Sequence, residues 1–143
     1  MKTYLLCAFA KLVLGREGRV FFTRDYQSFS VVDDKWIVIN PYEGEPDDDF
    51  IAHIREQHGF KRANEISLPV WTILHEIGHI RTDDFVESND EMRTILQMCY
   101  DYGGDYKKIN SMYYDLPDEW EATEWAIQFV KRHFRLCQLI SRI

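Results

Sequence analysis

Long apolar runs are missing from this sequence of 143 residues, since no stretch approaches the roughly 20 apolar residues that a membrane-spanning helix needs. An excess of basic side chains is missing too. Seventeen Lys and Arg residues stand against 24 Asp and Glu residues, which gives a net charge of -7, and a surface of that sign repels the phosphates of nucleic acids. We therefore expect neither a membrane nor a nucleic acid as a direct partner.

Glycine and proline are also few, with 7 and 4 residues, whereas apolar residues make up 45% of the chain. This composition excludes a disordered or low-complexity chain. The length suits one hydrophobic core, and no internal repeat or linker divides the sequence. We therefore expect a single domain over residues 1–143.

The cysteines do not form recognisable pairs, because Cys7, Cys99 and Cys137 are odd in number and widely separated. They predict neither a disulfide framework nor a Cys-x-x-Cys metal site. We expect reduced thiols in a cytoplasmic protein. Each cysteine is interpreted as a small core residue, with Cys99 and Cys137 on apolar faces of helices.

The first ten residues resemble a signal peptide in having one basic residue and a short apolar run. Lys11 interrupts that run, however, and the apolar residues from Leu5 to Val13 recur at helical spacing. We therefore interpret residues 3–14 as an amphipathic helix. It ends at Gly15, a residue type that readily takes the left-handed conformation after a helix.

The remaining pattern predicts a small sheet followed by helices. β-Branched and aromatic runs indicate strands at residues 20–23, 28–32 and 36–39, with a tight turn at residues 33–35 that suits antiparallel pairing. Cap residues and apolar periodicity predict further helices at residues 50–58, 67–80, 88–102 and 107–113, and a last long helix from residue 117. The fold class is thus α+β, a small antiparallel sheet of about three strands packed with a mainly helical remainder.

One of these helices carries a metal-binding motif. Residues 75–79 read His-Glu-Ile-Gly-His, and helical geometry brings residues four apart onto one face. Two imidazole nitrogens at that spacing bind zinc at about 2.0 to 2.1 Å, while the glutamate between them can reach a water beside the metal. The sequence therefore predicts one Zn²⁺ ion, with His75 and His79 as ligands and Glu76 as the base.

The surroundings of the motif favour a metal site over two histidines that merely pack in the core. Leu74, Ile77 and Ile80 are apolar, so we expect this helix to be mostly buried. Without a metal, buried histidines and a buried charged glutamate would each need a partner. Gly78 lies in the middle of the helix, where glycine costs about 1 kcal/mol relative to alanine. We expect another backbone or helix to approach Gly78 closely.

A catalytic zinc site usually has three protein ligands, so a third ligand is needed. A metzincin would supply a histidine at position 85, with glycine at position 82, but this chain has Thr82 and Phe85. The start of the last helix offers carboxylates instead. The candidates there are Glu119, Glu121 and Glu124, of which Glu124 fits a solvated helix face best.

Two stretches together resemble the ImmA/IrrE family of small zinc metallopeptidases, within the wider gluzincin group. They are residues 71–80, which hold the motif, and residues 116–126, which read Leu-Pro-Asp-Glu-Trp-Glu-Ala-Thr-Glu-Trp-Ala. The gluzincin pattern Glu-x-x-Ala-(Asp/Asn) falls on Glu119, so the resemblance implies a zincin-like fold with Glu119 as third ligand. Glu121 stays open as a competing ligand from the same helix start. Thr123 stands where Asp or Asn is common, so another group is expected to orient a ligand histidine.

The site indicates a mechanism in which Glu76 takes the proton of the attacking water and passes it to the leaving amine. The oxyanion needs a donor besides the metal. Tyr113 and Tyr114 are the candidates, and their spacing also fits core packing. The strand pair in residues 28–39 could align an extended substrate through main-chain hydrogen bonds. The other histidines are expected to be exposed or helix-terminal, with His53 as a reserve ligand.

These features predict a zinc-dependent endopeptidase that hydrolyses a peptide bond in a specific partner protein. The resemblance implies a helix-turn-helix transcriptional repressor as the substrate. The alternative is a catalytically silent, zinc-containing module of a phage or mobile element that binds a regulator. The fourth zinc position discriminates between them, because an open position favours catalysis, whereas a fourth protein ligand such as Asp83, Asp84 or His53 favours a structural metal.

Overall fold

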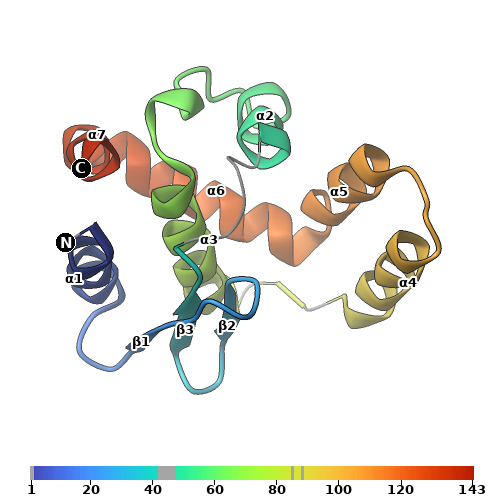
Figure 1. Cartoon of the computed structure of the whole chain (residues 1–143), viewed down its shortest axis with the longest axis horizontal. Helices are drawn as coiled ribbons and strands as arrows, with labels where there is room; N and C mark the ends of the chain where they lie inside the picture. The colour runs from blue at the N-terminus through green and yellow to red at the C-terminus, as the bar shows by residue number, and fades with distance from the viewer. Residues whose placement is uncertain (1, 42–47, 85, 88) are drawn as a thin grey trace.

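Helices dominate the computed structural model, which describes residues 2–41, 48–84, 86–87 and 89–143 (Figure 1). The helices are α1 (Lys2–Leu14), α2 (Asp48–Glu56), α3 (Leu68–Thr82), α4 (Asp90–Asp101), α5 (Tyr106–Tyr114), α6 (Pro117–Arg132) and α7 (Phe134–Arg142), and a short 3-10 helix, η1 (Ala63–Glu65), precedes α3. The strands are β1 (Arg19–Phe22), β2 (Phe29–Val31) and β3 (Trp36–Ile39). The expected α+β fold class with a three-stranded sheet is confirmed.

Helices α3 and α6 make the most extensive contact between two helices in the described chain. Ser67 takes the N-cap position of α3 and Pro69 lies in its first turn, as the sequence predicts. The buried apolar residues of α3 are Val70, Trp71, Ile73, Leu74 and Ile77. On α6, the small residues Ala122 and Ala126 are fully buried. The small side chains allow α6 to lie close against α3.

The three strands form one mixed sheet in the order β1-β3-β2. β2 and β3 pair antiparallel around the turn predicted at residues 33–35, where Lys35 has a φ of 56°. β1 pairs with β3 in parallel, so the expected antiparallel arrangement is wrong for this strand. Ile37 and Ile39 of β3 are fully buried. The strand with the most buried side chains takes the central place, and β1 is thereby separated from β2.

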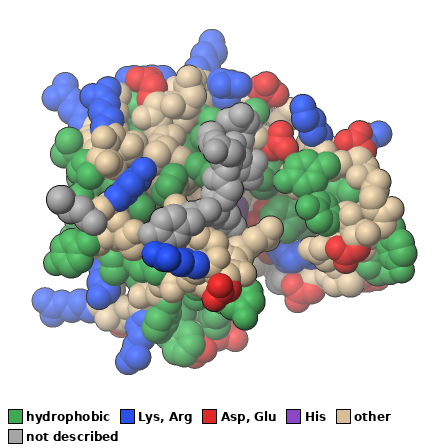
Figure 2. All heavy atoms as spheres, in the orientation of Figure 1, with side chains coloured by type: hydrophobic (Ala, Val, Ile, Leu, Met, Phe, Trp, Pro, Cys, Tyr) green, Lys and Arg blue, Asp and Glu red, His purple; other side chains and the backbone are tan. Residues whose placement is uncertain are grey.

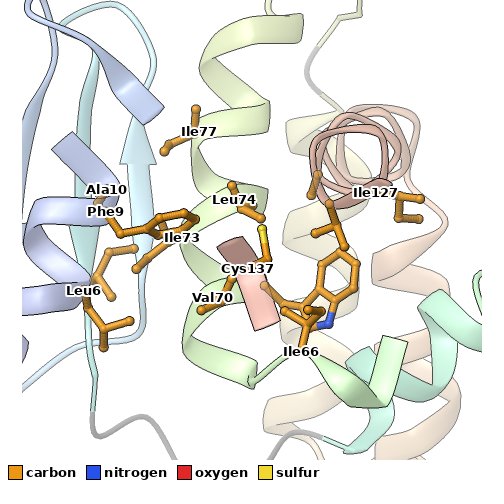
Figure 3. Packing of buried hydrophobic residues seen from close by; sticks show 14 of the residues in the cluster. Leu6, Phe9, Ala10, Ile66, Val70, Ile73, Leu74, Ile77, Ile127 and Cys137 are labelled. Atoms are coloured by element: carbon orange, nitrogen blue, oxygen red, sulfur yellow. The ribbon is translucent and has the colours of Figure 1, made fainter. Parts of the chain in front are cut away.

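A continuous core joins α1, the sheet, α3, α6 and α7. Figure 3 shows side chains of this cluster, among them Phe9 of α1, Ile73 of α3 and Ile127 of α6. Cys137 of α7 belongs to it and is fully buried, as predicted. Cys99 is exposed on α4, so the expectation of a core position is wrong for that residue; the buried residue of α4 is Leu96.

Helices α4 and α5 form a lobe beside this core, on the side away from α1 (Figure 1). Leu96 of α4, Ile109 of α5 and Leu116, which precedes α6, form a small buried cluster of their own, with Tyr113 packed against it. We call helices α4 and α5 the α4–α5 lobe. The lobe is anchored to the start of α6 by this cluster.

Two predicted helix starts differ from the observed ones. Asn89 caps α4, because its side chain accepts a hydrogen bond from the backbone N–H of Met92 at 3.4 Å. The predicted cap Ser88 lies outside the described residues, as does Asp47 of the acidic run expected to start the preceding helix. That helix, α2, begins two residues before the predicted start at Phe50.

A further helix, α7, follows the last one that the sequence predicts. α6 ends at Arg132, and His133 caps it with a φ of −128° and a ψ of 40°. The bend at His133 directs α7 back to the core, where Cys137 is buried. Within the described part of the chain, none of the helices is both long and apolar enough to cross a membrane.

Candidate metal centre

His75 and His79 lie one turn apart on α3, and both direct an Nε2 atom at Glu119 of α6. Oε2 of Glu119 lies 2.9 Å from Nε2 of His75 and 2.8 Å from Nε2 of His79. Taking one ligand atom from each residue, the three atoms all lie within 4.8 Å of one another. The structure therefore brings together the three predicted ligands, in a group that could hold a metal ion.

Glu119 reaches the histidines because α6 passes very close to α3 at Gly78. A Cβ atom at residue 78 would lie 2.4 Å from the carbonyl oxygen of Ala122 and 3.0 Å from its Cα. The first of these distances is shorter than real Cβ atoms show. The expected close approach at Gly78 is thus confirmed, and the approaching group is the backbone of α6.

Thr123 orients the imidazole of His75. Its Oγ1 lies 3.0 Å from Nδ1 of His75 and donates a hydrogen bond to the backbone carbonyl of Glu119, also 3.0 Å away. Since the hydroxyl proton is used, Oγ1 accepts from an Nδ1–H, and Nε2 then keeps the lone pair that a metal needs. The expectation that another group orients this ring is wrong, because a threonine hydroxyl here takes the place of a carboxylate.

The competing ligands point elsewhere. Glu121 is exposed on α6. Glu124, expected on a solvated face, places Oε1 2.8 Å from Nδ1 of the buried His58. The reserve ligand His53 is buried near the end of α2, where its Nε2 lies 2.9 Å from Oδ1 of Asp115. None of these three side chains belongs to the group that His75 and His79 form with Glu119.

A fourth protein ligand is not present within the described part of the chain. The metal-binding group found there consists of His75, His79 and Glu119. Asp83 and Asp84, the acidic candidates for closing the site, are exposed at the end of α3. The described residues therefore supply three side chains to this group, which is the number of protein ligands usual in catalytic zinc sites.

Glu76 lies beside this group and is buried, with 9% of its surface exposed. The hydroxyl of Ser30 on β2 lies near its carboxylate and offsets a small part of the rise that burial causes in its pKa. Burial raises the pKa of Glu76, and the neighbouring His75 and His79 offset part of that effect. A carboxylate whose pKa is raised is better suited to accept a proton than an exposed one.

Glu119 and His79 change each other's ionisation. Burial alone would raise the pKa of Glu119, but hydrogen bonds and charges from His75 and His79 outweigh it and hold this pKa well below its usual range. Burial alone would likewise lower the pKa of His79, but Glu119 overcomes this effect and raises it to about 9. A proton and a metal ion therefore compete for the same imidazole nitrogen.

A cleft of about 1110 Å³ opens beside the metal-binding group. It lies between the main body and the α4–α5 lobe, and Figure 2 shows the hollow between these two parts. The residues lining the cleft include Ser28, Phe50, His75 and Glu76 from the body and Arg93, Tyr100 and Ile109 from the lobe. His75 and Glu76 are thus accessible from a space large enough for a peptide segment.

The two tyrosines suggested by the sequence line this cleft but contact different neighbours. The hydroxyl of Tyr113 lies beside Glu119, and burial together with Glu119 raises the pKa of Tyr113. Tyr113 therefore remains a protonated donor beside the metal-binding group. The ring of Tyr114 stacks on Phe50 and contacts His53, with both centroid distances 5.2 Å, so its contacts are those of a packing residue.

Arg93 is a site residue that sequence reasoning misses. From α4, its Nη2 lies 2.6 Å from Oδ2 of Asp118 and 3.2 Å from Oε1 of Glu119. Its guanidinium carbon also lies 5.6 Å from the ring centroid of Tyr113. Twenty-six residues separate Arg93 from Glu119, and no sequence motif spans that distance. Only the three-dimensional position of α4 reveals the contact.

The donor set fits zinc, because two imidazole nitrogens and one carboxylate oxygen form the ligand set of a well-attested type of catalytic zinc site. The oriented Nδ1–H of His75 agrees with that use of Nε2. The chain matches no protein-family model, no curated protein and no solved structure. The resemblance to the ImmA/IrrE family therefore depends on the motif residues that α3 and α6 bring together.

Proposed function

We propose that this protein is a zinc-dependent hydrolase. The observation that carries the proposal is the convergence of His75 and His79 on Glu119, with the buried Glu76 beside them at the wall of a cleft. A buried glutamate next to two histidines and a second carboxylate is costly unless a cation or a proton balances the charge. A divalent cation at the three converging atoms provides that balance.

More particularly, we propose an endopeptidase that cuts an extended segment of a partner protein. β2 lies at an edge of the three-stranded sheet, and Ser30 of this strand contacts Glu76. Gln27 and Ser28, just before β2, line the cleft. An extended peptide can add to such an edge through main-chain hydrogen bonds, which would carry one of its peptide bonds past Glu76.

The proposed chemistry divides among a few side chains. A bound zinc ion would act as a Lewis acid and lower the pKa of water to about 7. Glu76 takes the proton of the attacking water and delivers it to the leaving amine, for which its raised pKa suits it. Tyr113 stays protonated and donates a hydrogen bond to the developing oxyanion. His75, His79 and Glu119 hold the ion.

The substrate proposed is a protein and not a nucleic acid, because the net charge of -7 opposes binding to phosphates. The resemblance to the ImmA/IrrE family adds a helix-turn-helix repressor as the candidate substrate and the cytoplasm as the compartment. The cleft of about 1110 Å³ has room for a segment of such a partner.

The test uses the zinc-loaded chain, a peptide library prepared from a bacterial proteome, and mass spectrometry to detect new N-termini. Wild type should generate a defined set of new N-termini. Glu76→Gln should bind one equivalent of zinc and generate none, because the amide cannot accept the proton. Glu121→Gln, which alters an exposed carboxylate of α6 outside the site, should cleave like wild type.

The outcomes separate the alternatives. Cleavage by Glu76→Gln would remove Glu76 from the mechanism. A wild-type chain that binds zinc but generates no new N-terminus would favour the silent binding module of a phage or mobile element. Loss of zinc binding in Glu121→Gln, with retention in Glu119→Gln, would reverse the assignment of the third ligand.

A further inference from the structure

The carboxylate of Glu119 uses its two oxygens differently. Oε2 faces the Nε2 atoms of His75 and His79, at 2.9 and 2.8 Å, whereas Oε1 lies 3.2 Å from Nη2 of Arg93. Only 2% of Glu119 is exposed, so bulk water does not solvate the carboxylate. A buried carboxylate oxygen requires a donor, and Arg93 supplies a charged one.

Arg93 is itself held in place. Its Nη2 donates to Oδ2 of Asp118 at 2.6 Å, and its Nη1 lies 3.5 Å from Oδ1 of Asp90. Asp118 precedes Glu119 in the first turn of α6, so one guanidinium contacts two successive residues there. Arginine suits this position because its planar head group carries five N–H donors in a fixed geometry.

We infer that Arg93 is a positioning residue of the metal centre, which engages Oε1 of Glu119 and so keeps Oε2 directed at His75 and His79. The inference rests on the proposed zinc site. In this role Arg93 acts through Glu119, whose Oε1 it engages and so leaves Oε2 for the ion. Removal of groups that orient a metal ligand typically costs about 10- to 100-fold in metal affinity.

Arg93 also connects the α4–α5 lobe to the metal centre. α4 packs chiefly against α5, and Arg93 lies on the wall of the cleft. The side chain of Arg93 thus connects α4, at the wall of the cleft, to the first turn of α6, which carries Glu119. Because its loss affects both the lobe and Glu119, the test needs one measurement for stability and another for the metal.

The test compares full-length wild type with Arg93→Met, which keeps a long side chain without donors. Zinc affinity is measured by competition with a chromogenic chelator, and the coordination geometry by the absorption spectrum of bound Co²⁺. Arg93→Met should bind zinc about 10- to 100-fold more weakly and show an altered Co²⁺ spectrum. If Arg93 only anchored the lobe, urea unfolding of the metal-free chain would change while affinity and spectrum stayed as in wild type, which would overturn the inference.

Two further variants keep the result interpretable. Arg62→Met removes an exposed arginine whose partner is Glu65, remote in sequence from the site, and should leave affinity unchanged. If Arg93→Met does not fold, Arg93→Lys takes its place and should bind zinc several-fold more weakly than wild type, because lysine lacks the planar fork. Wild-type affinity in Arg93→Lys would then overturn the role of Arg93.

The zinc titration of wild type separates this inference from the proposed function. A wild-type chain that binds no zinc overturns the metal centre, and the role of Arg93 with it. A wild-type chain that binds zinc, together with equal binding by a folded Arg93→Met, overturns the role of Arg93 alone.

Discussion

Thr123 and His75 lie on different helices, and their side chains meet in a buried contact in which Oγ1 is 3.0 Å from Nδ1. The same hydroxyl donates to the carbonyl of Glu119, one turn earlier on α6. The orientation of His75 is therefore coupled to the backbone that carries Glu119. A threonine achieves this without adding a further negative charge beside Glu119 and Glu76.

Replacement of Thr123 by valine should weaken zinc binding by about 10- to 100-fold. Valine preserves the shape of the side chain but leaves the Nδ1–H of His75 without its acceptor, which costs about 1 to 3 kcal/mol for a buried polar group. A chelator-competition titration with zinc measures the affinity. Circular dichroism establishes that the variant retains its helices.

Thr123→Ser is the matched control, since serine keeps the hydroxyl and loses one methyl group. Its zinc affinity should stay within a few-fold of wild type. Equal affinities in Thr123→Val and wild type would mean that the hydroxyl does not orient His75. A loss in both variants would assign the effect to packing at residue 123.

Gly78 sets the distance between the two ligand-bearing helices, so Gly78→Ala should destabilise the fold. The added Cβ would lie 2.4 Å from the carbonyl oxygen of Ala122, and overpacking of this kind typically costs about 1 to 3 kcal/mol. The better helix propensity of alanine, about 1 kcal/mol, offsets only part of that. Urea unfolding measures the loss, and Gln128→Ala, at an exposed position of α6, should change stability by less than about 0.5 kcal/mol.

The three residues of the candidate metal-binding group could be predicted because the information that brings them together is local. His75 and His79 are one turn apart on one helix, and Glu119 lies in a short pattern at the start of another. Gly78 could be interpreted for the same reason, since a glycine inside a buried helix has a cost that a close neighbour explains. Arg93 could not, because its contact with Glu119 depends on where α4 packs.

The elements of the fold that depend on local sequence could likewise be predicted, and those that depend on packing could not. The turn at residues 33–35 is local, and the hairpin of β2 and β3 was predictable from it. The position of β1 in the sheet depends on which strand is most buried against the helices. The expectation that β1 pairs antiparallel is therefore wrong, because β1 pairs with β3 in parallel. α7 depends on packing too, because no proline or glycine marks the bend at His133, and Cys137 becomes a core residue only through that bend.

His58 should make the stability of the folded chain fall below about pH 6.5. Burial lowers the pKa of His58, and its hydrogen bond with Glu124 offsets only part of that effect. The unfolded chain therefore binds a proton at higher pH than the folded chain does. The stability that neutral His58 contributes is fully present above the pKa that His58 has in the unfolded chain. It is lost as the pH falls toward the lower pKa that His58 has in the folded chain.

The measurement is urea unfolding at pH 7.5 and pH 5.5 for wild type and His58→Phe. Phenylalanine can keep the stacking on Trp120, whose ring centroid lies 3.7 Å from that of His58, and it does not titrate. The loss of stability between the two pH values should be smaller in His58→Phe than in wild type, since the substitution removes the imidazole whose pKa is lowered. Identical losses would show that His58 does not contribute.

Zinc should stabilise the folded chain, because the ligands come from two helices and are assembled only when α3 and α6 pack together. At a free zinc concentration 100 times Kd, the free energy of unfolding should rise by about 2.7 kcal/mol, and a chelator should reverse the gain. The metal-free chain should remain folded, since His75 and His79 lie within hydrogen-bond distance of Glu119 without the ion. His79→Ala should show no such gain, whereas Glu121→Gln should show all of it. A full gain in His79→Ala would place the ion outside the proposed centre.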